Sequence, residues 1–196
     1  SSFPAEDLVV VDQAWHLSGE FVSFAFALRN DNDELSVDFP AVDVVGRDAE
    51  GKVIFSSTEV LSVLNPGETM YFTSIANAGT TIPQTVDFLP VEPKAHNVRP
   101  DPSESSAFRV KNLSVREGSL GEAVFTGEVV REDGGGDTED PSYIVIVVAL
   151  RDAAGNLVDA VHTFANCPNP GATTTFEAAG FNVADYATFE AYAYPW

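Results

Sequence analysis

Two turn motifs recur along this chain at one fixed distance, and this recurrence limits the architecture more than any other feature. Arg-Asp-Ala-x-Gly occupies 47–51 and 151–155, and Asn-Pro-Gly-x-Thr occupies 65–69 and 169–173. The offset is 104 residues for both motifs (151 − 47 and 169 − 65), and a phenylalanine follows each copy of the second motif in the same register. Two motifs and an aromatic residue in constant register indicate an internal duplication.

The residues around each first motif are typical of a β-hairpin. The approach to the turn alternates over 41–46 and is a nearly continuous apolar run over 143–150, and β-branched residues dominate both stretches. Aspartate suits the first position of a turn, and glycine suits a position with positive φ. Apolar residues resume after each glycine, so we expect a return strand in both copies.

This pattern resembles the FxLYD-type domains of bacterial and archaeal secreted proteins. The strand that ends at Asp48 or Asp152, the glycine turn and the later Pro-Gly-Glu-Thr turn at 66–69 match that family, whereas 170–173 has Ala172 in place of the acid. Arginine replaces the family's aromatic residue before aspartate in both copies. The resemblance implies an immunoglobulin-like sandwich without catalytic residues, although other immunoglobulin-like families, such as BsuPI-type proteinase inhibitors, share similar turns.

We therefore predict an all-β fold class with two tandem immunoglobulin-like antiparallel β-sandwiches. The expected domains are 1–93 for the first copy and 107–196 for the second. The intervening stretch, 94–106, follows two prolines, contains two more and lacks apolar periodicity. We expect it to be a linker that proline makes semi-rigid and extended.

The charge balance excludes several classes of partner. The 196 residues include 30 Asp and Glu against 10 Lys and Arg, a formal net charge of −20. Nucleic-acid phosphates and anionic membrane surfaces both require a basic face, so we expect neither as a partner. No stretch approaches the roughly 20 apolar residues of a membrane-spanning helix. No signal peptide is visible, and we expect an extracellular or cell-surface location with that peptide removed.

Acidic loops at corresponding places in the two copies make calcium the cofactor to consider. Carboxylates clustered with backbone carbonyls are the ligands that Ca²⁺ prefers, although neither loop has the twelve-residue helix-loop-helix pattern. The alternative is that both are ordinary solvated loops of an acidic protein. The candidate ligands are Asp31, Asp33, Glu34, Asp133, Asp137 and Asp140.

The run 143–150 is apolar on both faces of the expected strand. Tyr143, Val145 and Val147 share one face, and the position that corresponds to Val147 in the first copy is Asp43. Either a loop of the same domain covers this second face, or the face is an interface with another domain or subunit. We carry the three residues forward as candidate interface residues.

Catalytic and modification signals are sparse. The three histidines do not repeat at the common offset, no two have metal-ligand spacing, and no Gly-x-Ser-x-Gly elbow is present. Cys167 is the single cysteine, without a basic neighbour in the sequence, and we expect a structural thiol. Asn112 begins an Asn-x-Ser sequon, which permits glycosylation if the chain is exported. We therefore do not expect an enzyme.

These observations favour a non-enzymatic exported structural or interaction protein of a cell surface or extracellular assembly. Its partners would be proteins, including a homo-oligomer or filament formed through strand edges. The alternative is a soluble extracellular ligand-binding or inhibitor module that acts through the loops of a sandwich.

Overall fold

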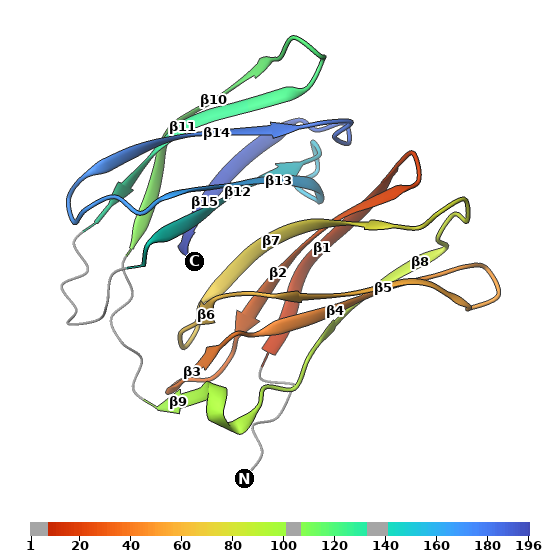
Figure 1. Ribbon diagram of the computed structural model, residues 1–196, viewed down its shortest axis with the longest axis horizontal. Helices are drawn as coiled ribbons and strands as arrows, with labels where there is room; N and C mark the ends of the chain where they lie inside the picture. Colours follow the sequence, from red (N-terminus) through yellow and green to blue (C-terminus); the bar gives the residue numbers. More distant parts are fainter. Residues whose placement is uncertain (1–7, 101–106, 133–140) are drawn as a thin grey trace. The chain divides into compact units, whose positions relative to one another are not determined.

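The computed structural model describes residues 8–100, 107–132 and 141–196. The chain divides into two compact units, Ser1–Pro102 and Ser103–Trp196. Figure 1 shows that both units are built from strands, and the regular helical structure in the described residues is one short 3₁₀ turn, η2, at Ala95–Asn97. No helix in the described part of the chain has the length and apolar character needed to cross a membrane.

The first unit contains three antiparallel sheets. Their strand orders are β1-β2-β7, β5-β4-β8 and the small β6-β3-β9. The strands are β1 (Leu8–Ser18), β2 (Phe21–Asn30), β3 (Leu35–Asp38), β4 (Ala41–Arg47), β5 (Val53–Val60), β6 (Val63–Leu64), β7 (Thr69–Asn77), β8 (Thr85–Pro90) and β9 (Val98–Pro100).

The second unit contains two antiparallel sheets, with strand orders β10-β11-β14 and β13-β12-β15. The strands are β10 (Phe108–Glu117), β11 (Ala123–Arg131), β12 (Tyr143–Arg151), β13 (Leu157–Asn166), β14 (Thr173–Gly180) and β15 (Thr188–Pro195). In each unit the chain crosses between two main sheets, as in an immunoglobulin-like sandwich.

The core of the first unit lies between its two main sheets. Alternation along β2 places Val22, Phe24, Phe26 and Leu28 on the inner face, where all four are buried. Phe88 of the opposite sheet contacts two of these rings, at centroid distances of 6.1 Å from Phe24 and 6.0 Å from Phe26. Contacts between side chains of facing sheets define a sandwich.

The core of the second unit has the same construction with different residues. Ile144, Ile146, Val148 and Leu150 of β12 point inward and pack with residues of β11 and β14. Phe125 of β11 meets Phe189 of β15 with ring centroids 5.3 Å apart. The predicted all-β fold of two tandem antiparallel sandwiches is therefore confirmed.

Strand pairing resolves how the two copies align before the first motif. Phe26 of β2 lies opposite Phe72, and Gly127 of β11 lies opposite Phe176, an offset of 101 (127 − 26) rather than 104. The second copy therefore gains three residues between its second strand and the strand that leads to the turn.

The expected linker is shorter than the proline content indicates. Residues 98–100 form β9, which pairs with β3 through Leu35 and Pro100. Arg99 also donates to both carboxylate oxygens of Asp38, at 2.7 and 3.0 Å. Residues 94–100 thus belong to the first unit, because a strand and an ion pair tie them to it, and the division between the units falls at 102/103.

Candidate functional site

The two Arg-Asp-Ala-x-Gly turns have the same hydrogen bonds in both units. Oδ1 of Asp48 accepts from the backbone N–H groups two and four residues later, at 3.0 and 2.8 Å. Oδ1 of Asp152 accepts from the matching groups at 3.0 and 2.9 Å. The glycine of each turn has positive φ, at 81° for Gly51 and 87° for Gly155. The duplicated motif is therefore a structural turn that the aspartate side chain stabilises in both copies.

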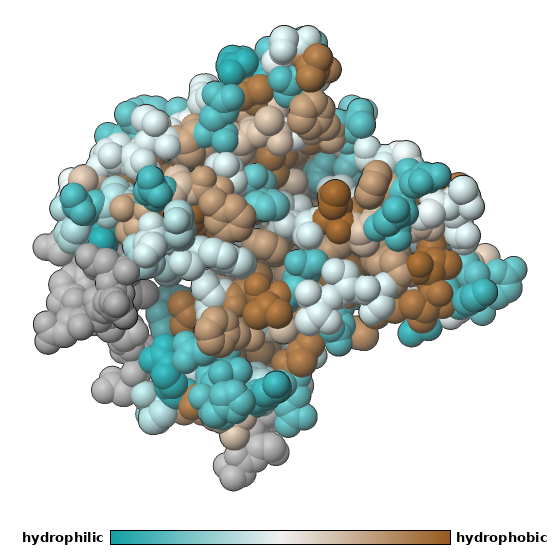
Figure 2. All heavy atoms as spheres, in the orientation of Figure 1, coloured by the Kyte–Doolittle hydropathy of each residue, from teal (hydrophilic) through white to brown (hydrophobic). Residues whose placement is uncertain are grey.

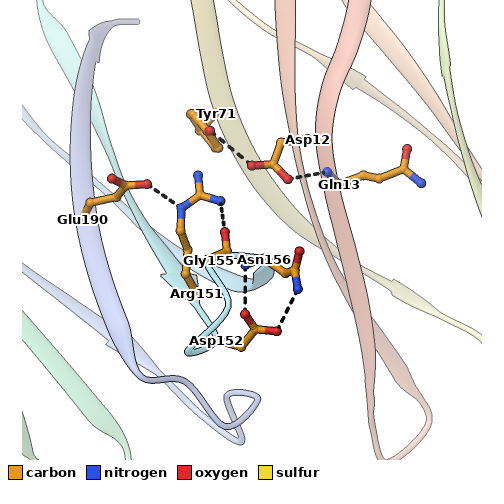
Figure 3. Close-up of polar contacts among 8 residues, drawn as sticks. All are labelled: Asp12, Gln13, Tyr71, Arg151, Asp152, Gly155, Asn156 and Glu190. Carbon is orange, nitrogen blue, oxygen red and sulfur yellow. Dashed lines mark hydrogen bonds and ion pairs between the residues drawn. The ribbon is translucent and has the colours of Figure 1, made fainter.

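The arginine before each aspartate caps the same turn. Nη1 of Arg47 and of Arg151 donates to the carbonyl of the turn glycine, at 3.1 and 3.2 Å. Each guanidinium also pairs with a carboxylate on the neighbouring strand, Arg47 with Asp87 at 3.8 Å and Arg151 with Glu190 at 2.6 Å. Figure 3 shows Arg151 between the turn glycine and Glu190. The arginine therefore makes the same two kinds of contact in both copies.

Asn156 distinguishes the second turn from the first. Its backbone N–H and its side-chain amide both donate to Asp152, the amide at 3.2 Å (Figure 3). These two bonds, in that order, lower the pKa of Asp152, and the amides of Ala154 and Gly155 lower it further. Position 52 of the first copy is lysine, which has no side-chain amide to donate in this way.

A buried polar residue makes backbone hydrogen bonds to the second turn motif in each unit, Asn30 to Gly67 and Glu68 and Arg131 to Gly171 and Ala172. The Asn30 side chain donates to the carbonyls of Leu35 and Leu64 at 2.8 and 3.1 Å. Its structural counterpart is Arg131, which is 5% exposed and donates to the carbonyl of Pro168 at 3.2 Å.

Arg131 also lies beside Cys167, the single cysteine. Its Nη1 lies 3.8 Å from Sγ of Cys167, and the thiol donates to the carbonyl of Pro168 at 3.5 Å. The sequence shows no basic neighbour for this cysteine, because Arg131 is 36 residues away and is brought to it by the fold. Cys167 is half-buried, as expected for a structural thiol.

The outer face of the β13-β12-β15 sheet contains the three candidate interface residues. Val145 and Val147 are fully buried, at 0% exposure, whereas Tyr143 is 54% exposed. Only Tyr143 of the three therefore has a large accessible surface.

Aromatic and imidazole rings occupy the positions that flank these residues. Directly paired residues of adjacent strands share a face. Phe164 and Tyr194 pair with Val145, His162 and Tyr192 pair with Val147, and the backbone N–H of Trp196 donates to the carbonyl of Tyr143. We call this set the aromatic face: Tyr143, His162, Phe164, Tyr192, Tyr194 and Trp196.

The rings of the aromatic face contact one another. Phe164 makes edge contacts with His162 and Trp196, at centroid distances of 5.6 and 5.5 Å. Tyr192 and Tyr194 are stacked at 6.4 Å. Burial lowers the pKa of His162, so its imidazole is neutral near pH 7 and adds no charge to the surface.

The corresponding face of the first unit has a polar pair at its centre, flanked by the exposed apolar residues Val60 and Leu89. Asp43 takes the place of Val147, and Oγ1 of Thr58, which takes the place of His162, donates to Asp43. Val60 takes the place of Phe164. Figure 2 shows hydrophobic residues dispersed among hydrophilic ones over the side of the molecule that it draws. The concentration of rings is thus a property of the second copy.

The structure describes only half of the predicted calcium site. Asp133, Asp137 and Asp140 lie outside the described residues. Of the others, Asp31 and Asp33 line a polar pocket of about 320 Å³ beside Gly67.

Arginine engages one of these acids. Arg29 donates to both oxygens of Asp31, at 2.5 and 3.3 Å, and this bond lowers the carboxylate's pKa. Among the described residues, no group of three or more His, Cys, Asp and Glu side chains, Glu34 included, is placed to hold a metal ion. Calcium binding remains a prediction.

The predicted glycosylation residue lies in a β-bulge. Asn112 has φ of 56° and sits where the register between β10 and β11 shifts, between Lys111 and Ser114. Its side chain is exposed and donates to Glu128 at 2.7 Å. Its exposure is compatible with glycosylation, which stays a prediction.

Comparisons with known proteins add little to the strand topology. No family model matches the chain, and no curated protein matches it. Among solved structures, the chain is similar to the N-terminal CBM22-1-CBM22-2 tandem domain of Xyn10C from Paenibacillus barcinonensis, with 12% identity and a TM-score of 0.14 over 100% of this chain and 88% of that one. A likeness at this level carries no argument about function.

Proposed function

We propose that this chain is a non-enzymatic interaction protein of a cell surface or extracellular assembly, and that two copies associate through the aromatic face. The observation that carries this proposal is the exposed group of three rings at one end of that face. Tyr143, Phe164 and Trp196 are 54%, 47% and 37% exposed. Aromatic side chains gathered at a surface are typical of protein interfaces.

The charge distribution favours this face as the contact between copies. Copies of a protein with a net charge of −20 repel one another, so association requires a surface where acidic groups are few. Strands β12, β13 and β15 contain two acidic residues. Asp159 is buried on the inner side, and Glu190 is paired with Arg151.

The duplicated turns support a place among FxLYD-type domains. Each copy keeps the strand that ends in aspartate, the glycine turn and the Pro-Gly turn. Under this proposal, the arginine caps described above take the place of the family's aromatic residue. Membership in a family of secreted proteins is in keeping with an extracellular location.

The experiment is light scattering over a range of protein concentrations. Measurements in about 1 M NaCl, where the Debye length is about 3 Å, remove most of the repulsion between copies. We expect the wild-type mass to rise above the 21.0 kDa of the monomer with concentration. The double variant Tyr143→Ser and Phe164→Ser should weaken association by about tenfold or more, because aromatic anchors dominate interfaces.

The first unit supplies a matched control. Phe39 and Val60 lie 104 residues before Tyr143 and Phe164, and both are exposed. The double variant Phe39→Ser and Val60→Ser removes comparable apolar surface and should leave association unchanged. A wild type that stays at 21.0 kDa at every concentration, or equal losses in the two double variants, contradicts the proposal.

The alternative function, a ligand-binding or inhibitor module, is supported by a different feature. A cleft opens at the loop end of the second sandwich, and it is lined by residues of the β10–β11 turn and the β14–β15 loop.

A further inference from the structure

The cleft at the loop end of the second unit has the size of a ligand site. Its volume is about 390 Å³, within the range of about 300 to 1,000 Å³ typical of small-molecule sites. Val115, Ala123, Val183 and Tyr186 supply its apolar lining. Tyr186 also contacts the rings of Phe125 and Phe189, at 6.0 and 6.2 Å, so the floor of the cleft is continuous with the core.

A buried carboxylate holds the loop that forms one wall. Asp159 is 3% exposed, and its Oδ2 accepts from the backbone N–H of Ala184 at 3.0 Å. Its Oδ1 accepts from the N–H of Ala160 at 2.8 Å. A buried, hydrogen-bonded carboxylate fixes the backbone it contacts, so the wall is ordered before any ligand arrives.

Close packing at the start of the same loop adds to this order. A Cβ built on Gly180 would lie 2.6 Å from side-chain atoms of Val161 and Val183. Glycine therefore allows the start of the loop to sit close against β13.

Two exposed apolar residues are next in the chain to residues that line the cleft, Leu120 beside Gly121 and Phe181 between Gly180 and Asn182. Leu120 of the β10–β11 turn is 80% exposed, and Phe181 of the opposite loop is 60% exposed. Exposed apolar groups next to a cleft are typical of a contact surface, because their burial against a partner removes apolar area from water.

The acidic residues around the cleft favour a positively charged partner. Glu117 and Glu122 lie in its lining, and the charge of Arg116 is offset by Glu177, whose carboxylate lies 3.5 Å from the guanidinium. Three carboxylates and one guanidinium give a local charge of −2, on a chain whose net charge is −20. This field attracts cations and repels acidic partners, including a second copy of the chain.

We propose that this cleft binds a basic segment of a partner protein, which inserts one apolar side chain between Leu120 and Phe181 and has lysine or arginine on either side. The proposal deepens the alternative function and uses none of the residues of the aromatic face.

The test uses the full chain and a defined peptide, acetyl-Gly-Lys-Trp-Lys-Gly-amide, followed by amide chemical shifts in NMR titrations. We expect shifts confined to 115–123 and 180–186, with a Kd of about 1 mM or tighter. Peptides in which glutamate replaces both lysines, or alanine replaces tryptophan, should bind at least about tenfold more weakly.

Variants of exposed residues locate the site without unfolding the chain. The double variant Leu120→Ser and Phe181→Ser should weaken binding of the basic peptide by about tenfold. Ile82→Ser is the matched control, because Ile82 lies in the β7–β8 loop of the first unit and is 70% exposed. This control should bind the peptide as the wild type does, and the Leu120 and Phe181 variant should leave self-association unchanged.

Three results overturn the proposal. The first is no shift in 115–123 or 180–186 at several times the expected Kd. The second is equal binding of the lysine and glutamate peptides. The third is binding of neutral phosphatidylcholine vesicles, lost in the Leu120 and Phe181 variant, which would make the apolar loop tips a lipid contact. Because none of these measurements involves the aromatic face, failure here leaves the proposed self-association standing.

Discussion

The two units fill one position of their cores in opposite ways. In the first unit Gly46 of β4 lies beneath the ring of Phe55, and a Cβ at Gly46 would be only 2.1 Å from that ring. In the second unit the equivalent pair is Leu150 and Asp159, and Leu150 is fully buried. The large side chain is thus on β5 in the first unit and on β12 in the second. The position on β13 that corresponds to Phe55 is Asp159, whose carboxylate anchors the β14–β15 loop.

The outer faces of the same sheets differ as much. Asp43 and Thr58 form a hydrogen-bonded polar pair in the first unit, where the second has Val147 and His162. The turns that bound these strands keep matching hydrogen bonds in both copies. The same turns thus bound the strands of both sandwiches. Between these turns, cross-strand pairs of residues differ between the units, and these differences produce the aromatic face and the anchor of the β14–β15 loop.

The largest expected effect comes from removing the core side chain that only the second unit has. Leu150→Ala should destabilise the second unit by about 2 to 5 kcal/mol, because truncation of a buried leucine leaves a cavity that the packed sheets close only in part. Urea unfolding followed by NMR, which separates signals of the two units, measures this cost. A cost below about 1 kcal/mol would mean that the core of the second unit does not depend on this exchange.

The opposite change tests the first unit. Gly46→Ala should destabilise it by about 1 to 3 kcal/mol, because the added Cβ overlaps the ring of Phe55. The same change in a Phe55→Ala background should cost much less, because the ring is gone. A double-mutant cycle measures this coupling, and additive costs would show that the glycine is required for another reason.

Salt should act on the two units alike. Counting Asp and Glu against Lys and Arg gives 16 − 5, a net −11, for Ser1–Pro102, and 14 − 5, a net −9, for Ser103–Trp196. Excess like charge opposes the compact state, and salt screens it over a Debye length of about 10 Å at 0.1 M. Calorimetry in increasing NaCl should show both melting temperatures rising by similar amounts, and a flat or falling curve for either unit contradicts this.

The smallest effect concerns the side-chain amide that only the second of the duplicated turns has. The pKa of Asp152 is lower in the folded chain than in the unfolded one, chiefly through bonds from Asn156. Its contribution to stability is therefore present above the unfolded pKa of about 3.9 and is lost as pH falls through the folded pKa. Asn156→Ala removes the side-chain amide and should raise the Asp152 pKa toward its ordinary value in an NMR titration. The matched change Lys52→Ala in the first copy should leave the Asp152 titration where it is.

Local turn chemistry and alternation made the fold predictable from the sequence. Asp-Ala-x-Gly specifies its own hydrogen bonds over five residues, and the alternation of Val22, Phe24, Phe26 and Leu28 identifies a core face without knowledge of any partner strand. Both features depend on neighbours in the chain, so they could be read before the structure.

Contacts between distant strands could not be predicted. The aromatic face depends on the register that places Phe164 and Tyr192 beside the valines of β12, and several registers fit the sequence equally well. The approach of Arg131 to Cys167 and the bond from Ala184 to Asp159 likewise join residues whose spacing carries no signal. The four prolines within 90–106 indicate a linker, whereas residues 98–100 in fact pair with β3 as a strand.

The most direct test of the central claim, that the second copy alone has become an interaction surface, is hydrogen exchange on dilute and concentrated wild-type protein, read by mass spectrometry. The account predicts that protection increases with concentration in peptides of β12, β13 and β15 and stays constant in β4, β5 and β8, which serve as the control within the same molecule. Constant protection in both sheets, or an equal increase in both, would contradict it.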